Sequence, residues 1–232
     1  MKLDVAQLNQ SYGESHTLWD MDLLVEEGSC TCLMGRNGVG KTTLLKTIMG
    51  LLRATSGSIG FGTHSLTHDS PDARAKKGIG FVPQGREIFG QLTVGENLRT
   101  GLSARSDGRN DIPERVFELF PVLRTMLNRR GGDLSGGQQQ QLAIGRAMAL
   151  DPKLLILDEP TEGIQPNIVA QIAEILIDLN RKQGLTILLV EQKLPFARKV
   201  ADRFVVMDRG RAVASGKMAQ LDSDVVTKYL TV

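Results

Sequence analysis

The segment Gly35–Thr42, which reads GRNGVGKT, constrains the fold of this chain more than any other feature. It has the form G-x-x-x-x-G-K-[ST], a loop whose backbone N–H groups surround phosphates. The strand-like run Ser29–Met34 precedes the loop, and residues 42–52 carry apolar side chains at helical spacing. Strand, glycine-rich loop and helix are the context that a phosphate-binding loop requires. This context disfavours the alternative, a glycine-rich turn with an unrelated lysine.

The loop residues have separate expected roles. Lys41 can reach the β- and γ-phosphates of a nucleotide, and the Thr42 hydroxyl can ligate Mg²⁺. The glycines permit the dihedral angles and the close approach that phosphates need. The residues expected to bind the nucleotide here are Gly35, Arg36, Asn37, Gly38, Val39, Gly40, Lys41, Thr42 and Thr43.

Charge and hydropathy exclude several classes of protein. The net charge of this 232-residue chain is +2, from 28 basic and 26 acidic residues, which gives no field that would favour nucleic acid as a partner. No apolar run approaches the ~20 residues that a membrane-spanning helix needs. The first residues lack the apolar region of a signal peptide. We therefore expect a cytoplasmic protein that reaches a membrane only through partners.

The two cysteines, Cys30 and Cys32, lie in a strand-like stretch with one residue between them. Their side chains would share one face of the strand, where two thiols are poorly placed for a disulfide. The favoured interpretation is a pair of small buried residues in a reducing compartment, rather than a redox or metal site.

The order of predicted elements indicates an α/β fold with a mainly parallel sheet and an inserted helical lobe. A polar stretch, residues 63–77, is expected to be irregular before a short helix. Pro113 is expected as a first helical residue, and Pro121 is expected to end or kink its helix. Further strands are predicted at Gly57–Phe61, Ile79–Pro83, Leu154–Leu157, Leu185–Val190 and Phe204–Met207, and helices at Val94–Arg105, Pro113–Phe120, Gln138–Leu150 and Asn167–Lys182, with a loop at Ser106–Asp111. We expect one domain over residues 1–232, with a core of residues 1–85 and 151–232 and a helical lobe at about 86–150.

Two acidic residues, Asp158 and Glu159, end the apolar strand at Leu154–Leu157. We expect this strand to lie beside the phosphate loop. An aspartate at a strand end suits Mg²⁺, directly or through water, and a following glutamate suits a general base that aligns water on the γ-phosphate. The alternative is a pair of exposed acids that cap the next helix.

A second glycine-rich motif, Leu134-Ser-Gly-Gly-Gln138, runs into a helical pattern. The start of a helix presents free N–H groups that can bind an anion. The expected ligands at this second anion site are Ser135, Gly136, Gly137 and Gln138.

Together, and in this order, these motifs make the chain resemble the ATP-binding subunits of ABC transporters over essentially its whole length. The resemblance implies a RecA-like P-loop NTPase core, an N-terminal antiparallel β part and ATP hydrolysis with Mg²⁺. Residues 35–42 resemble the Walker A loop, Leu154–Asp158 the Walker B strand, and Leu134–Gln138 the family signature. Glu159 takes the place of the catalytic glutamate.

The resemblance assigns two further residues. Gln84 falls where the family has the Q-loop glutamine, which contacts Mg²⁺ and the attacking water and couples to the membrane subunits. Tyr12 falls where an aromatic ring normally stacks on adenine, although an aromatic residue in a β-turn is the alternative there.

In this family two subunits face each other head to tail, so that the phosphate loop of one and the signature of the other hold each ATP. An interface held by a ligand and loosened by hydrolysis is a known type of switch. A monomer is therefore expected to be a poor catalyst.

The chain departs from the family pattern at two positions. Gln192 stands where most members carry a switch histidine, and Gln165 ends the segment where most carry an aspartate. A glutamine amide can donate a hydrogen bond to the γ-phosphate but cannot relay a proton near neutral pH. The role of general base then falls on Glu159, unless Gln192 is simply an exposed residue.

Both departures resemble one branch of the family, the second ATPase of branched-chain amino-acid and urea importers. Gln84 and the signature with its run of glutamines, Gln138–Gln141, look most like the urea importer. This resemblance implies a motor for import of urea or short amides, peripheral on the inner face of the membrane. The implied partners are a second ATPase subunit, two permease subunits and, indirectly, an external solute-binding protein. A heterodimer is favoured over a homodimer.

Other functions remain as alternatives. The first is a branched-chain amino-acid importer, and the second is a soluble ABC protein that acts on ribosomes or DNA. A small-molecule kinase or GTPase would lack the motif at Leu134–Gln138. Docking to permeases is expected near Gln84–Leu98, where four apolar residues could line a groove or could equally belong to the core. These are Phe89, Leu92, Val94 and Leu98. No role is assigned to residues 211–232.

Overall fold

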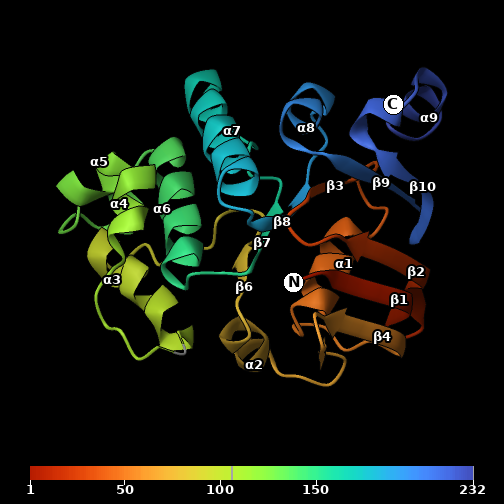
Figure 1. Cartoon of the computed structure of the whole chain (residues 1–232), viewed down its shortest axis with the longest axis horizontal. Coiled ribbons are helices and arrows are strands. Elements are labelled where there is room, and N and C mark those ends of the chain that lie inside the picture. Colours follow the sequence, from red (N-terminus) through yellow and green to blue (C-terminus); the bar gives the residue numbers. More distant parts are fainter. Residues whose placement is uncertain (106, 232) are drawn as a thin grey trace.

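Two β-sheets with different strand directions organise the chain (Figure 1). The structure is a computed structural model that describes residues 1–105 and 107–231. The first sheet is antiparallel throughout and has the order β2-β1-β4-β5. Its strands are β1 (Leu3–Tyr12), β2 (Ser15–Val25), β4 (Ser56–Phe61) and β5 (His64–Ser65). This is the N-terminal antiparallel part that the resemblance implied.

The second sheet has the order β10-β9-β3-β8-β7-β6 and is parallel except for the edge strand β10. Its strands are β3 (Cys30–Met34), β6 (Ile79–Val82), β7 (Leu154–Asp158), β8 (Thr186–Val190), β9 (Arg203–Asp208) and β10 (Arg211–Lys217). The strand that ends in Asp158 is therefore not paired with the strand that enters the phosphate loop, because β8 lies between them. The carboxyl ends of β3, β7 and β8 nevertheless meet at one edge.

Nine helices of more than one turn lie within the described residues. They are α1 (Lys41–Ile48), α2 (Pro71–Lys76), α3 (Val94–Thr100), α4 (Glu114–Leu119), α5 (Pro121–Thr125), α6 (Gly136–Ala149), α7 (Pro166–Arg181), α8 (Leu194–Val200) and α9 (Ser223–Tyr229). None of the described helices combines the length and the apolar character that would let it cross a membrane.

The parallel sheet separates two apolar clusters, and its strands supply alternate side chains to each. In β7, Leu155 and Leu157 pack with α6 and α7 on one face, while Leu154 and Ile156 face the cluster shared with α1 and the antiparallel sheet. Buried parallel strands are apolar on both faces for this reason. Helix α1 therefore sits between the two sheets, and its first residue points to the edge where the strands end.

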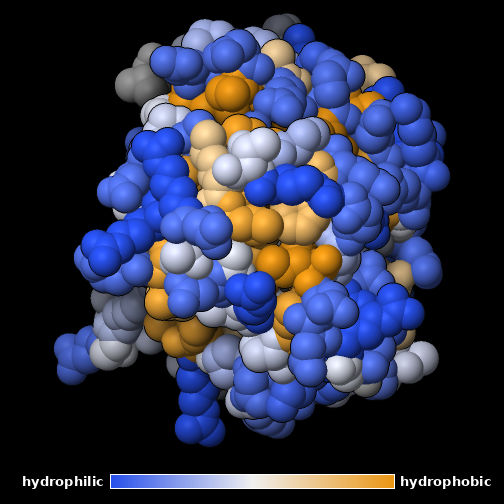
Figure 2. Space-filling model, turned by 90° about the vertical axis from the view of Figure 1, so that its left-hand side faces the viewer, coloured by the Kyte–Doolittle hydropathy of each residue, from blue (hydrophilic) through white to orange (hydrophobic). Residues whose placement is uncertain are grey.

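Helices α3 to α6 gather at one side of the molecule (Figure 1). Gly145 of α6 lets them approach closely, since a Cβ there would lie only 3.1 Å from Leu123, 3.2 Å from Val116 and 3.3 Å from Leu98. On the surface of this side, hydrophobic areas are interspersed with hydrophilic residues (Figure 2). These helices belong to the segment that the sequence predicted to be helical.

Several helix ends differ from the prediction. Helix α1 ends at Ile48 and not at Leu52, because Gly50 adopts a φ of +75°. The last carbonyl groups of the helix, those of Thr47 and Ile48, instead accept hydrogen bonds from the buried Arg74 guanidinium at 2.8 Å and 2.6 Å. The helix predicted up to residue 105 ends as α3 at Thr100 and continues as a 3-10 turn.

The two prolines act somewhat differently from the prediction. Pro113 is the N-cap and not the first helical residue of α4, since its ψ of 136° is extended. Pro121 does end the preceding helix, and it also begins α5. Of the loop predicted at residues 106–111, Ser106 lies outside the described residues.

Candidate functional site

The phosphate loop joins β3 to α1 in the predicted manner. Strand β3 ends at Met34, and Gly40, with a φ of +107°, is the N-cap of α1. Gly35 has a φ of +154°, and a Cβ at this position would lie 2.4 Å from the Met207 carbonyl oxygen of β9. Only glycine fits such a close approach of two backbones. The sheet therefore fixes the entrance of the loop, and α1 fixes its exit.

Lys41 occupies the centre of this loop. Its Nζ donates to the carbonyl oxygens of Gly35 (2.8 Å) and Arg36 (2.9 Å), and it lies 3.9 Å from Glu159 Oε1. Burial lowers the pKa of Lys41, while the charges of Glu159 and Asp158 act in the opposite direction. The loop thus encloses an ammonium group where the phosphates of a nucleotide would lie.

Thr42 and Asp158 meet across the gap between α1 and β7. The Thr42 hydroxyl donates to Asp158 Oδ2 at 3.1 Å, while Asp158 Oδ1 is buried and has no hydrogen-bond partner among the described residues. Burial raises the pKa of Asp158 to about 6, against the lowering effect of the Thr42 hydrogen bond. A hydroxyl beside an unpartnered carboxylate oxygen is a hard oxygen donor set that suits Mg²⁺. The residues present therefore fit the predicted metal.

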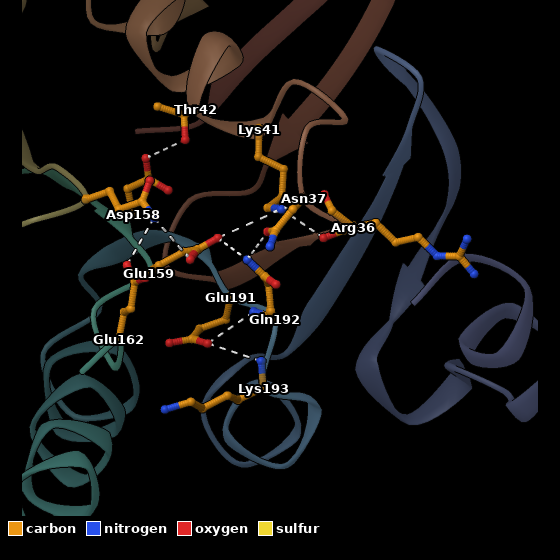
Figure 3. Close-up of polar contacts among 12 residues, drawn as sticks. Arg36, Asn37, Lys41, Thr42, Asp158, Glu159, Glu162, Glu191, Gln192 and Lys193 are labelled. Atoms are coloured by element: carbon orange, nitrogen blue, oxygen red, sulfur yellow. Dashed lines mark hydrogen bonds and ion pairs between the residues drawn. The ribbon is translucent and has the colours of Figure 1, made fainter. Parts of the chain in front are cut away.

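Glu159 follows Asp158 with an unusual backbone, a φ of +50°. Its Oε1 accepts a hydrogen bond from Gln192 Nε2 at 2.5 Å, and its Oε2 accepts one from Gln84 Nε2 at 3.4 Å (Figure 3 for the contact with Gln192). A non-glycine residue in this region is commonly found where the surrounding structure holds it for function. The carboxylate is thereby aimed at the phosphate loop.

The two glutamines predicted from the family pattern both reach this carboxylate. Gln192 Nε2 also donates to Asn37 Oδ1 in the phosphate loop at 2.6 Å. Gln84 Nε2 also donates to Glu162 Oε2 at 3.0 Å. Gln192 is exposed, and its amide nevertheless joins the phosphate loop to the predicted base.

A cavity of about 670 Å³ opens over these residues. Its lining consists of Thr17, Asn37, Gly38, Gly40, Lys41, Thr42, Thr43, Gln84, Glu159, Thr161, Glu162, Gly163, Glu191, Gln192 and Lys193. Nine of these were predicted as site residues from the sequence: Asn37, Gly38, Gly40, Lys41, Thr42, Thr43, Gln84, Glu159 and Gln192. Asp158 lies next to the cavity through its hydrogen bond with Thr42.

Other predicted residues lie apart from this cavity. The Arg36 guanidinium points away from it and donates to the carbonyl oxygens of Thr231 and, at 3.5 Å, Lys228 at the end of α9 (Figure 3 for the direction of Arg36). Any contact of Arg36 with phosphate would have to come from its backbone. Tyr12 is half-exposed, and its hydroxyl lies 3.5 Å from Thr43 Oγ1. Stacking of Tyr12 on adenine stays a prediction.

The signature motif forms the N-terminus of α6, as its pattern predicted. Ser135 is the N-cap, its Oγ accepts from Gln138 N at 3.4 Å, and Gln138 Oε1 accepts from Ser135 N at 3.0 Å. None of the residues Ser135–Gln138 lines the cavity. Within one chain, the structure does not bring the signature and the phosphate loop together.

Six cavity residues were not assigned roles from the sequence, namely Thr17, Thr161, Glu162, Gly163, Glu191 and Lys193. Thr17 comes from β2, far from every motif, so no local pattern could have found it. The other five lie within four residues of Glu159 or directly beside Gln192 along the chain, and their nearness to those residues was the only available signal.

Comparison with known proteins shows which proteins this chain is similar to. The family model described as "ABC transporter" matches residues 18–162. A high-affinity branched-chain amino acid transport ATP-binding protein, BraG of Pseudomonas aeruginosa, is 42% identical over 212 residues and 91% of each chain. A probable branched-chain amino acid transport ATP-binding protein, LivF of Archaeoglobus fulgidus, is 36% identical over 94% of this chain and 93% of its own.

A solved structure confirms the predicted fold class. It is a dimeric ATP-binding cassette in a post-hydrolysis state with ADP and phosphate bound, 27% identical, with a TM-score of 0.84 over 93% of this chain and 98% of its own. The matched family model spans the phosphate loop, the signature and Glu159. The chain therefore belongs to the ABC transporter family, as an ATP-binding cassette that hydrolyses ATP.

Proposed function

We propose that this chain drives the import of branched-chain amino acids by hydrolysing ATP on the inner face of a cell membrane. The observation that carries the proposal is the similarity to BraG, which covers 91% of both chains at 42% identity and is named for that solute class. LivF, which carries a related name, is also similar over more than nine-tenths of each chain. These relatives favour the amino-acid importer over the urea importer that the motif resemblance favoured.

Urea or a related short amide is the second candidate solute, because Gln84 and the glutamines at 138–141 resemble the urea importer's subunit. The residues gathered at the cavity are those proposed to bind a nucleotide, and none is assigned to a transported solute. The solute would be selected by the permeases and the external binding protein.

The hydrolysis step follows from the placement of four side chains. Lys41 would neutralise charge on the β- and γ-phosphates, and Thr42 and Asp158 would hold Mg²⁺, which when bound withdraws charge from the phosphate oxygens. Glu159 would accept a proton from a water whose oxygen attacks the γ-phosphorus. The bond from that phosphorus to the β–γ bridging oxygen breaks, and ADP and phosphate leave.

Gln192 would assist this step without relaying a proton. Its amide nitrogen already donates to Glu159 and Asn37, at 2.5 Å and 2.6 Å. Because a neutral amide cannot take up a proton near pH 7, the basic role stays with Glu159. Gln192 thus orients the base and, when ATP is bound, can turn one N–H to the γ-phosphate.

A second cassette would complete the site. The signature at the start of α6 presents helix N-terminal N–H groups outside the cavity, so that another subunit can use them as an anion site. The similar solved cassette is a dimer, which supports this arrangement. Gln165 and Gln192, where most members carry aspartate and histidine, favour a heterodimer with a different second ATPase.

The permeases would dock in a groove between the helices and the core. This groove, of about 570 Å³, is lined by Phe89, half-exposed, and by Phe81, Ile88 and Arg146 among others. The Arg146 guanidinium lies 5.3 Å from the centre of the Phe89 ring. Four residues were predicted for docking. Two of them, Val94 and Leu98 of α3, are fully buried in the apolar core and do not line the groove.

The test is uptake of labelled leucine and labelled urea by cells whose only copy of this chain carries Glu159→Gln. A wild-type copy, expressed to the same level, serves as the control. We expect the variant to lose leucine uptake and to keep urea uptake. Loss of urea uptake alone would assign the second candidate, and survival of both would refute a role in importing either solute.

A further inference from the structure

Glu191 is a buried carboxylate that neither the motifs nor the hydrolysis step uses. It follows the last residue of β8 and is 2% exposed. Among the described residues, no lysine, arginine or histidine lies within ion-pair distance of it. A buried charge without a partner of opposite sign is costly unless hydrogen bonds satisfy its oxygens.

Four donors from two loops supply these hydrogen bonds. Oε1 accepts from Thr161 Oγ1 at 2.6 Å and from Thr161 N at 3.2 Å. Oε2 accepts from the backbone N–H groups of Gln192 at 3.1 Å and Lys193 at 3.2 Å (Figure 3 for Gln192 and Lys193). Lys193 Nζ reaches back to the Thr161 carbonyl oxygen at 3.0 Å, so the two loops are joined twice.

The two loops that Glu191 joins are the ones that carry the proposed base and its partner. Thr161 lies two residues after Glu159, whose backbone is held at a φ of +50°. Gln192 directly follows Glu191 and supplies the amide that lies 2.5 Å from Glu159 Oε1. Displacement of either loop would therefore change the distance between Glu159 and Gln192.

We propose that Glu191 is a positioning residue for ATP hydrolysis, which fixes the loop after Glu159 against the loop that begins at Gln192. Hydrogen bonds to a charged acceptor are roughly twice as strong as neutral ones, and the loss of one side would leave a buried charge underpaired. The carboxylate thus holds both loops in a single arrangement. This inference rests on the proposed assignment of Glu159 as the base.

Glu191 does not itself replace Glu159 as the base. Both of its oxygens are occupied by donors of the protein. Glu159 is the carboxylate within reach of Lys41 at 3.9 Å. The effect of Glu191 should therefore be on the rate of turnover and not on the affinity for ATP.

The first test is the ATPase activity of the full chain with Glu191→Gln, which keeps the volume but places an NH₂ group against one of the two pairs of donors. We expect kcat to fall by on the order of tenfold to a hundredfold, the effect of a small misplacement at a reacting centre. The KM for ATP and the affinity for a fluorescent ATP analogue should change by less than about twofold. A raised KM with an unchanged kcat would overturn the proposal.

Thr161 supplies a matched pair of variants that does not depend on how Glu191→Gln folds. Thr161→Val removes the hydroxyl that lies 2.6 Å from Glu191, whereas Thr161→Ser keeps it. We expect Thr161→Val to lower kcat and Thr161→Ser to retain it. If both variants turn over ATP like the wild type, the contact has no role in positioning.

The double variant Glu191→Gln/Thr161→Val tests whether the two residues act through one interaction. We expect its kcat to equal that of the slower single variant, since effects on a shared contact do not add. Independent, multiplicative losses would overturn the proposal. Glu159→Gln measured alongside separates the two ideas, because full activity in that variant would refute the base and not the contact between Glu191 and Thr161.

Discussion

Gln192 Nε2 lies 2.5 Å from Glu159 Oε1, and the same nitrogen lies 2.6 Å from Asn37 Oδ1. One amide group therefore connects the phosphate loop to the carboxylate proposed as the base. We propose that this connection lets Gln192 stand in for a histidine at this position. A glutamine can orient Glu159 through a hydrogen bond even though it cannot carry a proton near neutral pH.

Replacement of Gln192 and of Glu159 should therefore have unequal effects. Gln192→His keeps a donor at the same place, so we expect ATP turnover within a few-fold of the wild type. Glu159→Gln removes the proton acceptor, and we expect a loss of on the order of a hundredfold or more. Steady-state phosphate release measures both. Equal losses in the two variants would contradict the assignment of the base.

Asp158 should make the stability of the nucleotide-free protein depend on pH. Burial raises its pKa from 3.8 to about 6, so the folded state binds a proton that the unfolded state has already lost between these values. The contribution of this group to the free energy of unfolding is fully present below pH 3.8. It falls by at most about 3 kcal/mol as the pH rises through 6. Asp158→Asn cannot titrate. Its stability relative to the wild type should therefore increase from pH 4 to pH 7.

Urea unfolding at a series of pH values measures this difference. Adding Mg²⁺ at pH 7 should stabilise the wild type, because the cation favours the charged carboxylate, and should leave Asp158→Asn unchanged. A constant stability difference between the two proteins from pH 4 to pH 7 would show that burial does not shift the pKa of this carboxyl.

Arg36 should contribute little to nucleotide binding through its side chain. Its guanidinium donates to carbonyl oxygens at the end of α9 and points away from the cavity. We expect Arg36→Ala to change the affinity for ATP by less than about twofold and to expose the C-terminal residues to proteolysis. Lys41→Ala, which removes the ammonium at the centre of the loop, is the control that should abolish binding. A tenfold loss of affinity in Arg36→Ala would contradict the orientation seen here.

Phe89 should be needed for transport but not for hydrolysis by the isolated chain. It is half-exposed in the groove proposed for permease docking. We expect Phe89→Asp to abolish uptake in cells and co-purification with the permeases, while the ATPase activity of the purified chain stays within about twofold. Val213→Asp, at an exposed apolar residue on the edge strand β10, is the matched control and should support normal uptake. If Val213→Asp abolished uptake and Phe89→Asp did not, the permeases would dock away from the Phe89 groove.

The sequence predicted the parts of the site that local patterns encode. Lys41 and Thr42 sit in a motif whose spacing fixes its own geometry, and Asp158 ends a short apolar run that favours a buried strand. Their meeting at 3.1 Å was therefore foreseeable. The position of β8 between β3 and β7 was not, because strand order depends on how crossovers pack and not on the residues of one segment.

Contacts between distant loops were also beyond local patterns. Nothing in the local sequence around Glu191 indicates that Thr161, thirty residues earlier, will donate a hydrogen bond to it. Likewise, spacing alone could not separate Phe89, which is half-exposed, from Val94 and Leu98, which are buried. Strand β10 was missed because most of its side chains are exposed and it shows no alternation of apolar and polar residues.

Light scattering of the Glu159→Gln chain with ATP and Mg²⁺ tests the central claim most directly, namely that the signature of one cassette completes the cavity of another. The variant cannot turn over the nucleotide that holds the interface, so bound ATP should trap the dimer. The measurement is made on this chain alone and on this chain mixed with the second ATPase. In at least one of the two mixtures we expect the mass of a dimer with ATP and of a monomer with ADP. A monomer at every ATP concentration in both mixtures would contradict the claim.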